Sequence, residues 1–260
     1  MRNFKFIIFI SFGFVILSFE FPLEAFALLS VRTNNERIGI GAFYHGSRVN
    51  ITGEADPYTD IIIKITSPEG SQSLKKKGKV AGLLWMNRED LEFRNIPNVY
   101  LLYSTKGIED ILSKDEIDKY SIGYSALKRQ AEITTISDEN EKTKWFNEFI
   151  RFKEYSKLYN MTQESIYTIM NDGKLEYSIN INWQYQAPPG DYTISAYAVK
   201  NNMVIEKSES KFIVEHIGTV RMLANMAKNN GAMYGIVSIV IAIIAGFAVG
   251  IIFRMARGGH

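Results

Sequence analysis

The sequence predicts a mainly β protein: an Ig-like antiparallel β-sandwich with a helical insertion, followed by one C-terminal transmembrane helix. Three observations lead to this fold class. Apolar and polar residues alternate in short runs early and late in the chain, the period changes between about residues 107 and 170, and residues 233–253 contain no charge. The absence of cysteine excludes disulfides and thiol chemistry, and a net charge of +2 is too small to indicate a nucleic-acid partner.

The strands are predicted from runs of period two that are separated by turn residues. After the insertion, residues 175–183 alternate, Pro188-Pro189-Gly190-Asp191 forms a turn, and Asn201-Asn202 joins two further strands. We expect one sandwich with strands from both sides of the insertion, because three late strands are too few to close a core. The alternative is two small domains divided near residue 107. The early strands are expected at 37–43, 49–54, 61–66, 80–86, 91–96 and 99–103.

The insertion is predicted to be helical because its apolar residues recur every three to four positions. Its clearest helix runs from Glu141 to Tyr159, with Trp145, Phe149, Phe152, Tyr155 and Tyr159 along one side. Shorter helices are expected at 108–112, at 113–117 with Ser113 as the cap, at 124–132, and at 164–170.

The N-terminus has the three parts of a secretory signal. Arg2 and Lys5 precede an apolar run from Phe6 to Phe19, and the small-x-small pattern Ala25-Phe26-Ala27 follows. We predict a signal peptide over residues 1–27 that is cleaved after Ala27. The alternative is an uncleaved N-terminal anchor, against which Glu20 and Pro22 argue.

The C-terminal apolar stretch is long enough to cross a bilayer. Met233–Phe253 spans roughly 30 Å as a helix, with Tyr234 at one end and Arg254 and Arg257 at the other. The predicted order is therefore an extracytoplasmic body over 28–216, a connector over 217–232 with a weak amphipathic stripe, the transmembrane helix over 233–253, and a cytoplasmic tail over 254–260. We therefore expect a single-pass membrane protein with its body outside the cytoplasm; in a bacterium with two membranes this means the cell inner membrane, with the body in the periplasm.

One face of the predicted span carries small residues that recur every four positions: Ser238, Ala242, Gly246 and Gly250. Small side chains allow a second helix to approach closely, so this face is a candidate for helix packing with a partner or with a second copy. The alternative is that the face meets lipid.

The sequence contains no recognisable catalytic or metal-binding motif. His45, His216 and His260 are far apart, and the phosphate-loop and serine-nucleophile patterns are absent. Glu54 and Asp56 could hold calcium or act as an acid–base pair, but a solvated strand end is the better interpretation. We therefore expect a non-enzymatic protein without cofactor.

The strongest charge run consists of Lys75, Lys76, Lys77 and Lys79. It could contact anionic lipid or an acidic partner, whereas the plainer interpretation is a soluble hairpin tip, since lysines also protect sheet edges. The large aromatic residues Trp85, Trp145 and Trp183 have the spacing of core positions rather than of an exposed ligand patch.

Several stretches have a distinctive sequence. The most specific is Val80-Ala-Gly-Leu-Leu-Trp-Met-Asn87, and the others are Arg48–Thr52, Phe93–Pro97, Pro189–Thr193 and the ending Tyr234–Arg254. In these stretches the chain resembles the Alph_Pro_TM family of transmembrane proteins first defined in alphaproteobacteria. The resemblance implies a signal peptide, an extracytoplasmic domain and one C-terminal span. It also implies association with permeases of the sulfite-exporter type, and it supplies no catalytic residues.

These observations favour a non-enzymatic membrane accessory protein whose extracytoplasmic domain recognises a partner, with a sulfite-exporter-type permease as the partner that the resemblance implies. The bilayer is the other expected partner, and self-association through the transmembrane helix is an alternative. The alternative function is a periplasmic anion- or ligand-binding domain tethered to the membrane.

Overall fold

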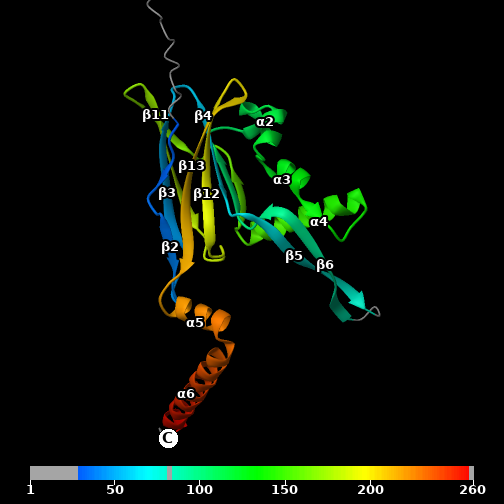
Figure 1. Ribbon diagram of the computed structural model, residues 1–260, viewed down its shortest axis with the longest axis vertical. Helices are drawn as coiled ribbons and strands as arrows, with labels where there is room; N and C mark the ends of the chain where they lie inside the picture. Colours follow the sequence, from blue (N-terminus) through cyan, green and yellow to red (C-terminus); the bar gives the residue numbers. More distant parts are fainter. Residues whose placement is uncertain (1–28, 81–83, 258–260) are drawn as a thin grey trace, which may run out of the picture.

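The computed structural model describes residues 29–80 and 84–257, and the predicted signal peptide over 1–27 lies outside this part. The described chain forms β-sheets flanked on one side by helices, with one long helix at its C-terminal end (Figure 1). This confirms the expected fold class, a mainly β protein with a helical insertion and a single apolar C-terminal helix.

Two sheets form the body. The smaller sheet has the order β1-β3-β11-β10, with β1 at Arg32–Thr33, β3 at Ser47–Ala55, β11 at Lys174–Trp183 and β10 at Tyr167–Asn171. The larger sheet has the order β2-β13-β12-β4-β7-β9, with β2 at Arg37–Ile40, β13 at Met203–His216, β12 at Gly190–Lys200, β4 at Asp60–Thr66, β7 at Tyr100–Ser104 and β9 at Tyr159–Thr162.

The two sheets enclose one core, built from strands on both sides of the insertion. Ile51 on β3 and Ile179 on β11 pack in the same buried cluster as Ile63 on β4 and Ile194 on β12. The strand β3 pairs with β11, and β4 pairs with β12, so each sheet joins an early strand to a late one. Neither half of the chain could close this core alone.

The strands β4, β7 and β12 of the larger sheet are buried on both faces, since helices cover the face that points away from the sandwich core. Ile62, Tyr100 and Tyr197 on this second face pack in one cluster with Phe149 of the longest helix. The covering helices are α1 at Ile108–Ile111, α2 at Lys114–Lys119, α3 at Tyr124–Gln130 and α4 at Glu139–Tyr155. As expected, the Ser113 side chain caps α2, accepting a hydrogen bond from the amide of Glu116 at 3.4 Å.

Two strand pairs are parallel, although the sequence predicted an antiparallel sandwich. The strand β9 lies parallel to β7, and β2 lies parallel to β13. Parallel neighbours require a crossover. The helices α1 to α4 provide it between β7 and β9, and β2 reaches the edge of the larger sheet before the chain crosses to β3 in the other sheet.

The insertion departs from its sequence-based description in two places. The helix α4 buries Phe146, Phe149, Ile150 and Lys153, whereas Phe152 and Tyr155 are exposed and Tyr159 belongs to β9. The predicted helix at 164–170 is wrong, because Tyr167–Asn171 is a strand that pairs with β11.

A long hairpin projects from the body beside α4 (Figure 1). It consists of β5 at Glu69–Val80 and β6 at Leu84–Pro97, and β8 at Glu132–Ile133 completes this third sheet. The predicted single strand over 80–86 is wrong, because β5 ends at Val80 and β6 begins at Leu84, while residues 81–83 lie outside the described part.

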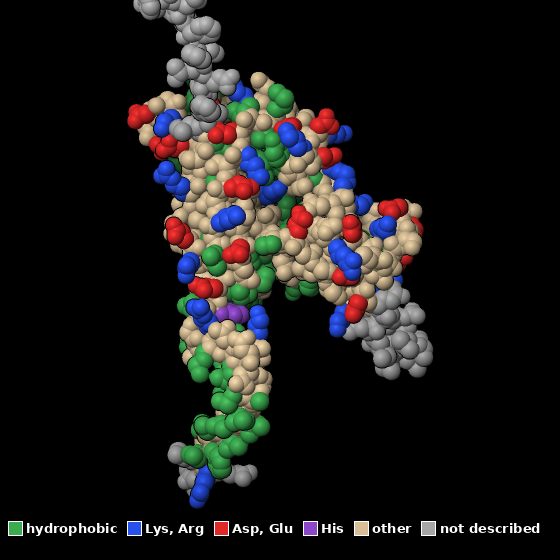
Figure 2. All heavy atoms as spheres, in the orientation of Figure 1, with side chains coloured by type: hydrophobic (Ala, Val, Ile, Leu, Met, Phe, Trp, Pro, Cys, Tyr) green, Lys and Arg blue, Asp and Glu red, His purple; other side chains and the backbone are tan. Residues whose placement is uncertain are grey.

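At the C-terminal end, α5 at Gly218–Asn229 follows β13, and α6 at Gly231–Arg257 follows after Asn230 alone. The most apolar 18-residue window within residues 231–254 of α6 has a mean hydropathy of 3.0, and none of that window is buried against the rest of the protein. Figure 2 shows α6 covered by hydrophobic side chains, in contrast to the mixed polar surface of the body.

Candidate functional site

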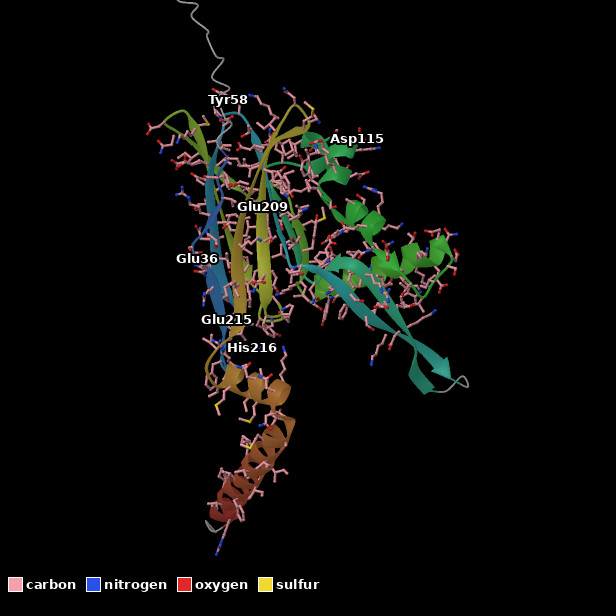
Figure 3. All side chains as sticks on the ribbon, viewed as in Figure 1. Glu36, Tyr58, Asp115, Glu209, Glu215 and His216 are labelled. Atoms are coloured by element: carbon pink, nitrogen blue, oxygen red, sulfur yellow. The ribbon has the colours of Figure 1, made fainter. Side chains whose placement is uncertain are left out.

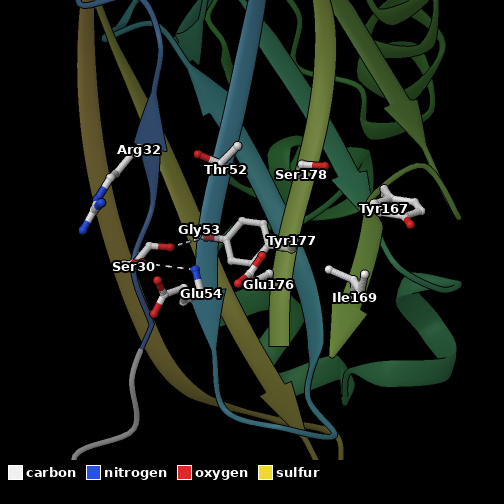
Figure 4. Close-up of a pocket in the computed structure, with 10 residues that line it drawn as sticks. All are labelled: Ser30, Arg32, Thr52, Gly53, Glu54, Tyr167, Ile169, Glu176, Tyr177 and Ser178. Atoms are coloured by element: carbon white, nitrogen blue, oxygen red, sulfur yellow. Dashed lines mark hydrogen bonds between the residues drawn. The ribbon is translucent and has the colours of Figure 1, made fainter. Parts of the chain in front are cut away.

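An open groove lies on the outer face of the smaller sheet (Figure 4). Cross-strand register builds it, because residues that face one another across strands share a face of the sheet. One row runs through Arg32, Thr52, Ser178 and Tyr167, and the groove has a volume of about 420 Å³.

Beneath this groove, on the core face of the sheet, Gly53 leaves room for Tyr177. Tyr177 faces Gly53 across the β3–β11 pair, and its buried hydroxyl donates a hydrogen bond to the carbonyl of Ser30 at 2.5 Å. A Cβ at position 53 would overlap both the Ser30 carbonyl and the Tyr177 ring. Burial also raises the pKa of Tyr177, so this hydroxyl remains a proton donor.

The charged groups of the groove are mostly acidic. Glu54 lies opposite Glu176 in register, and Arg32 contributes the cation among the lining residues. Lys174 at the strand end forms an ion pair with Glu54 at 2.9 Å, and its hydrogen bond and charge lower the pKa of Glu54. The ion pair with Lys174 therefore favours the charged form of Glu54, and the two carboxylates and two cations together leave the groove without the excess positive charge that would attract an anion.

The strand β10 forms one wall of the groove and the free edge of its sheet. Among the described strands it pairs with β11 alone, and each of its five residues is exposed. Tyr167, Ile169 and Met170 are 67%, 49% and 47% exposed. Edge strands are ordinarily protected by lysine, proline or a bulge, and the sequence Tyr-Thr-Ile-Met-Asn contains none of these.

The lysine run does not lie in a turn. Lys75–Lys79 belongs to β5, where Lys76 forms an ion pair with Glu141 of α4 at 3.2 Å and lies 5.3 Å from the centre of the Trp145 ring. In the antiparallel β5–β6 pair, Lys77 lies opposite Asn87 and Lys79 lies opposite Trp85. That the lysine run makes an electrostatic contact with lipid or with a partner stays a prediction.

The small residues of the transmembrane segment share one continuous helix. Gly246 and Gly250 have open space where a Cβ would stand, and Ser238 donates its hydroxyl to the carbonyl of Tyr234 at 2.8 Å. With Ala242 they leave a shallow face available to another helix. Whether a partner packs there stays a prediction.

Glu54 and Asp56, considered as an acid–base or calcium pair, lie in different surroundings. Glu54 is on β3 and pairs with Lys174, whereas Asp56 follows the strand end, where its carbonyl accepts a hydrogen bond from Thr59. Within residues 29–80 and 84–257, no three histidine, aspartate or glutamate side chains converge as a metal site would require.

A comparison with known protein families matches nearly the whole described chain, including most of the C-terminal helix. The model of the family described as "Putative transmembrane protein (Alph_Pro_TM)" matches residues 28–255, which include both the sandwich and α6. This chain belongs to the Alph_Pro_TM family. A comparison with curated proteins gives no match. The Alph_Pro_TM match and the exposed apolar helix together make the chain a single-pass membrane protein in contact with the lipid bilayer.

Sequence reasoning missed β10, although a signal for it was present. Asp172-Gly173 connects β10 to β11, and both residues have positive φ values of 47° and 76°. An Asp-Gly pair between two apolar segments is a strong hairpin signal, since that turn needs positive φ at both central positions. In Alph_Pro_TM members with such a pair here, the same edge strand is expected.

Proposed function

We propose that this Alph_Pro_TM protein is a non-enzymatic accessory protein of the inner membrane whose periplasmic body recognises a partner protein by strand addition to β10. One observation carries the proposal: β10 is an edge strand whose five residues are all exposed, with three large apolar side chains among them and no lysine, proline or bulge. An added strand would satisfy the backbone groups of this edge, and alternate side chains of the partner would contact the groove.

The groove beside β10 supports a protein partner over a small anion. Glu54 and Glu176 lie opposite each other in register, and Arg32 and Lys174 only balance their charge, so the groove offers a free anion no net positive charge. A peptide strand with basic or polar side chains meets complementary groups, and Tyr167 and Ile169 offer it apolar contact. The tethered anion-binding domain is therefore the less supported alternative.

The membrane arrangement in this proposal follows from the two ends of the chain. A cleaved signal peptide and a final stop-transfer helix leave the body in the periplasm and Arg254 on the cytoplasmic side. A permease of the sulfite-exporter type is the partner that the family resemblance suggests. It would meet β10 outside the membrane and the face around Gly246 within it.

The test uses the absence of native cysteine. Thr168→Cys on β10 is co-expressed with a sulfite-exporter-type permease from the same genome and treated with a short photo-activated maleimide crosslinker. A crosslink to the permease supports the proposal. A crosslink to a second copy of this chain, or none, contradicts the assignment of the permease as the partner at β10.

A matched pair of variants separates the edge strand from general surface hydrophobicity. Ile169→Lys places a charge on β10, and Met203→Lys makes the same change on β13 at a residue that is 56% exposed. We expect Ile169→Lys to abolish co-purification of the permease in mild detergent and Met203→Lys to preserve it. Equal losses in both variants would contradict strand addition at β10.

A further inference from the structure

The helix α5 is amphipathic along its whole length, although it touches little of the body. At 3.6 residues per turn, Arg221, Asn225, Lys228 and Asn229 fall on one side of it. Apart from Thr219 in the first turn, the opposite, wider arc is apolar and contains Val220, Met222, Leu223, Ala224, Met226 and Ala227.

The rest of the described chain leaves part of the apolar arc exposed. Met222 is 62% exposed and Leu223 is 39% exposed, while Ile217, just before the helix, is 44% exposed. Large apolar side chains gathered on one helix mark a contact surface when the helix adjoins a membrane segment.

Both ends of α5 are held in place. At its start, the Ile217 amide donates to the carbonyl of Ile40 at 3.0 Å, and the Ile217 side chain occupies the space where a Cβ on Gly39 would stand. Glu215, which Figure 3 labels beside His216 above α5, lies 3.6 Å from Arg37 and 3.9 Å from Arg221. The direction in which α5 leaves the body is therefore set by β2 and β13.

The far end of α5 passes directly into the membrane helix. Asn230 alone separates it from α6; its amide donates to Met226 at 2.8 Å and its side chain accepts from the amide of Met233 at 3.3 Å. With no longer linker, the C-terminal end of α5 must lie close to the layer where α6 enters the bilayer. In Figure 1, α5 runs across the base of the body above α6.

We infer that α5 lies in the periplasmic interface of the bilayer, with its apolar arc among the acyl chains and with Arg221 and Lys228 bound to the phosphates of anionic lipids. Two cations seven residues apart fall on the same side of a helix, so both reach headgroup level together. Lipid is the occupant that fits, because α5 is continuous with the spanning helix and carries complementary charge. The inference rests on α6 spanning the bilayer and not on the role of β10.

The test is the depth of single labels on the full-length chain in lipid nanodiscs. Nitroxides at Leu223→Cys and Asn225→Cys report the two sides of α5, and Ile243→Cys reports the middle of α6. We expect Leu223 to be accessible to oxygen and shielded from a nickel chelate, Asn225 to show the reverse, and Ile243 to be the most deeply buried.

Two results would overturn the assignment. If Leu223 is open to nickel while Ile243 is shielded, α5 stands in water although α6 spans. If Leu223 is shielded from both reagents, a protein or a second copy covers it instead of lipid. A nickel-accessible Ile243 would instead show that α6 does not span, which separates failure of the anchor from failure of this inference.

A second arm tests the headgroup contact. The preference for spin-labelled phosphatidylglycerol over phosphatidylcholine near position 225 should fall about fivefold for each cation removed in Arg221→Gln and Lys228→Gln. Arg254→Gln, at the other end of α6, should leave that preference unchanged. An unchanged preference in the double variant would contradict the binding of anionic lipid by α5.

Discussion

At the scale of single residues, two positions are decided by close packing or by burial. Gly53 leaves room for the Tyr177 ring and for its hydrogen bond to Ser30, which joins the N-terminal segment to the sandwich. Lys153 is 3% exposed, and its Nζ lies 2.9 Å from the Asn98 side-chain oxygen and 3.1 Å from Gln72 Oε1. Both bear on stability.

Gly53→Ala should destabilise the protein by roughly 2–3 kcal/mol, because the added methyl group forces the Ser30 carbonyl and Tyr177 apart. Gly70→Ala is the matched control, since no atom lies within 4 Å of the Cβ that it would add. Thermal unfolding of both variants in mild detergent measures the difference. Equal midpoints would show that Tyr177 adjusts without cost.

The stability of the body should rise with pH between about pH 7 and about pH 10. Burial lowers the pKa of Lys153 and of Lys64 to about 8 in the folded protein, so in this range the unfolded chain binds more protons than the folded one. Each lysine contributes up to ~3 kcal/mol to this rise. Denaturant midpoints measured across the range should increase, and a flat or falling profile would contradict the burial of these amines.

Comparison of two variants tests how much of this rise in stability with pH is due to Lys153. Lys153→Met removes the titrating group, so its midpoint should rise less with pH than that of the native chain. Lys200→Met changes an exposed lysine and should leave the profile as it is. Above about pH 10 the trend should reverse, because burial raises the pKa of Tyr100 and Tyr177 and only the unfolded chain ionises them.

At the scale of elements, α4 shows where period alone misleads. Its apolar residues form two overlapping stripes that share Phe149, one through Trp145 and Phe152 and the other through Phe146 and Ile150. The second stripe is buried, and it includes Lys153. From the sequence alone, a lysine at this position is expected to be exposed because it is charged. The partners of Lys153 come from β5 and from the end of β6, which helical spacing does not reveal.

A matched pair of substitutions tests the buried face of α4. Phe149 is 2% exposed and stacks on Phe93 at 4.5 Å, whereas Phe152 is 51% exposed. Phe149→Ala should cost roughly 3–5 kcal/mol, and Phe152→Ala should cost less than ~1 kcal/mol. Unfolding midpoints of the two variants provide the measurement. A larger loss of stability in Phe152→Ala than in Phe149→Ala would show that α4 buries the face expected from the sequence.

The candidate site was predictable only in part. The alternation of β3 and β11 indicates which of their residues face outward, so the polar floor of the groove could be derived from period two. The pairing of β3 with β11 joins segments more than a hundred residues apart, and no local pattern specifies that register. The sequence predicts a helix where β10 lies, because the spacing of Ile166, Ile169 and Met170 also fits a helix.

At the scale of the whole molecule, the sequence predicted the arrangement more reliably than the local detail. The sandwich draws its strands from both sides of the insertion because each sheet needs early and late strands to bury its inner face. The C-terminal helix was identified by length and by the absence of charge, and its exposure in the structure agrees with a lipid environment. What composition could not reveal is the crossover that makes β7 and β9 parallel neighbours.

The central claim is that α6 crosses the bilayer and leaves the body on one side. The most direct measurement is labelling of Lys200→Cys in the body and Ala256→Cys beyond the span with a membrane-impermeant maleimide, using sealed vesicles of uniform orientation that contain the full chain. The account predicts that one position reacts before detergent is added and the other only afterwards. Reaction of both positions from the same side would contradict it.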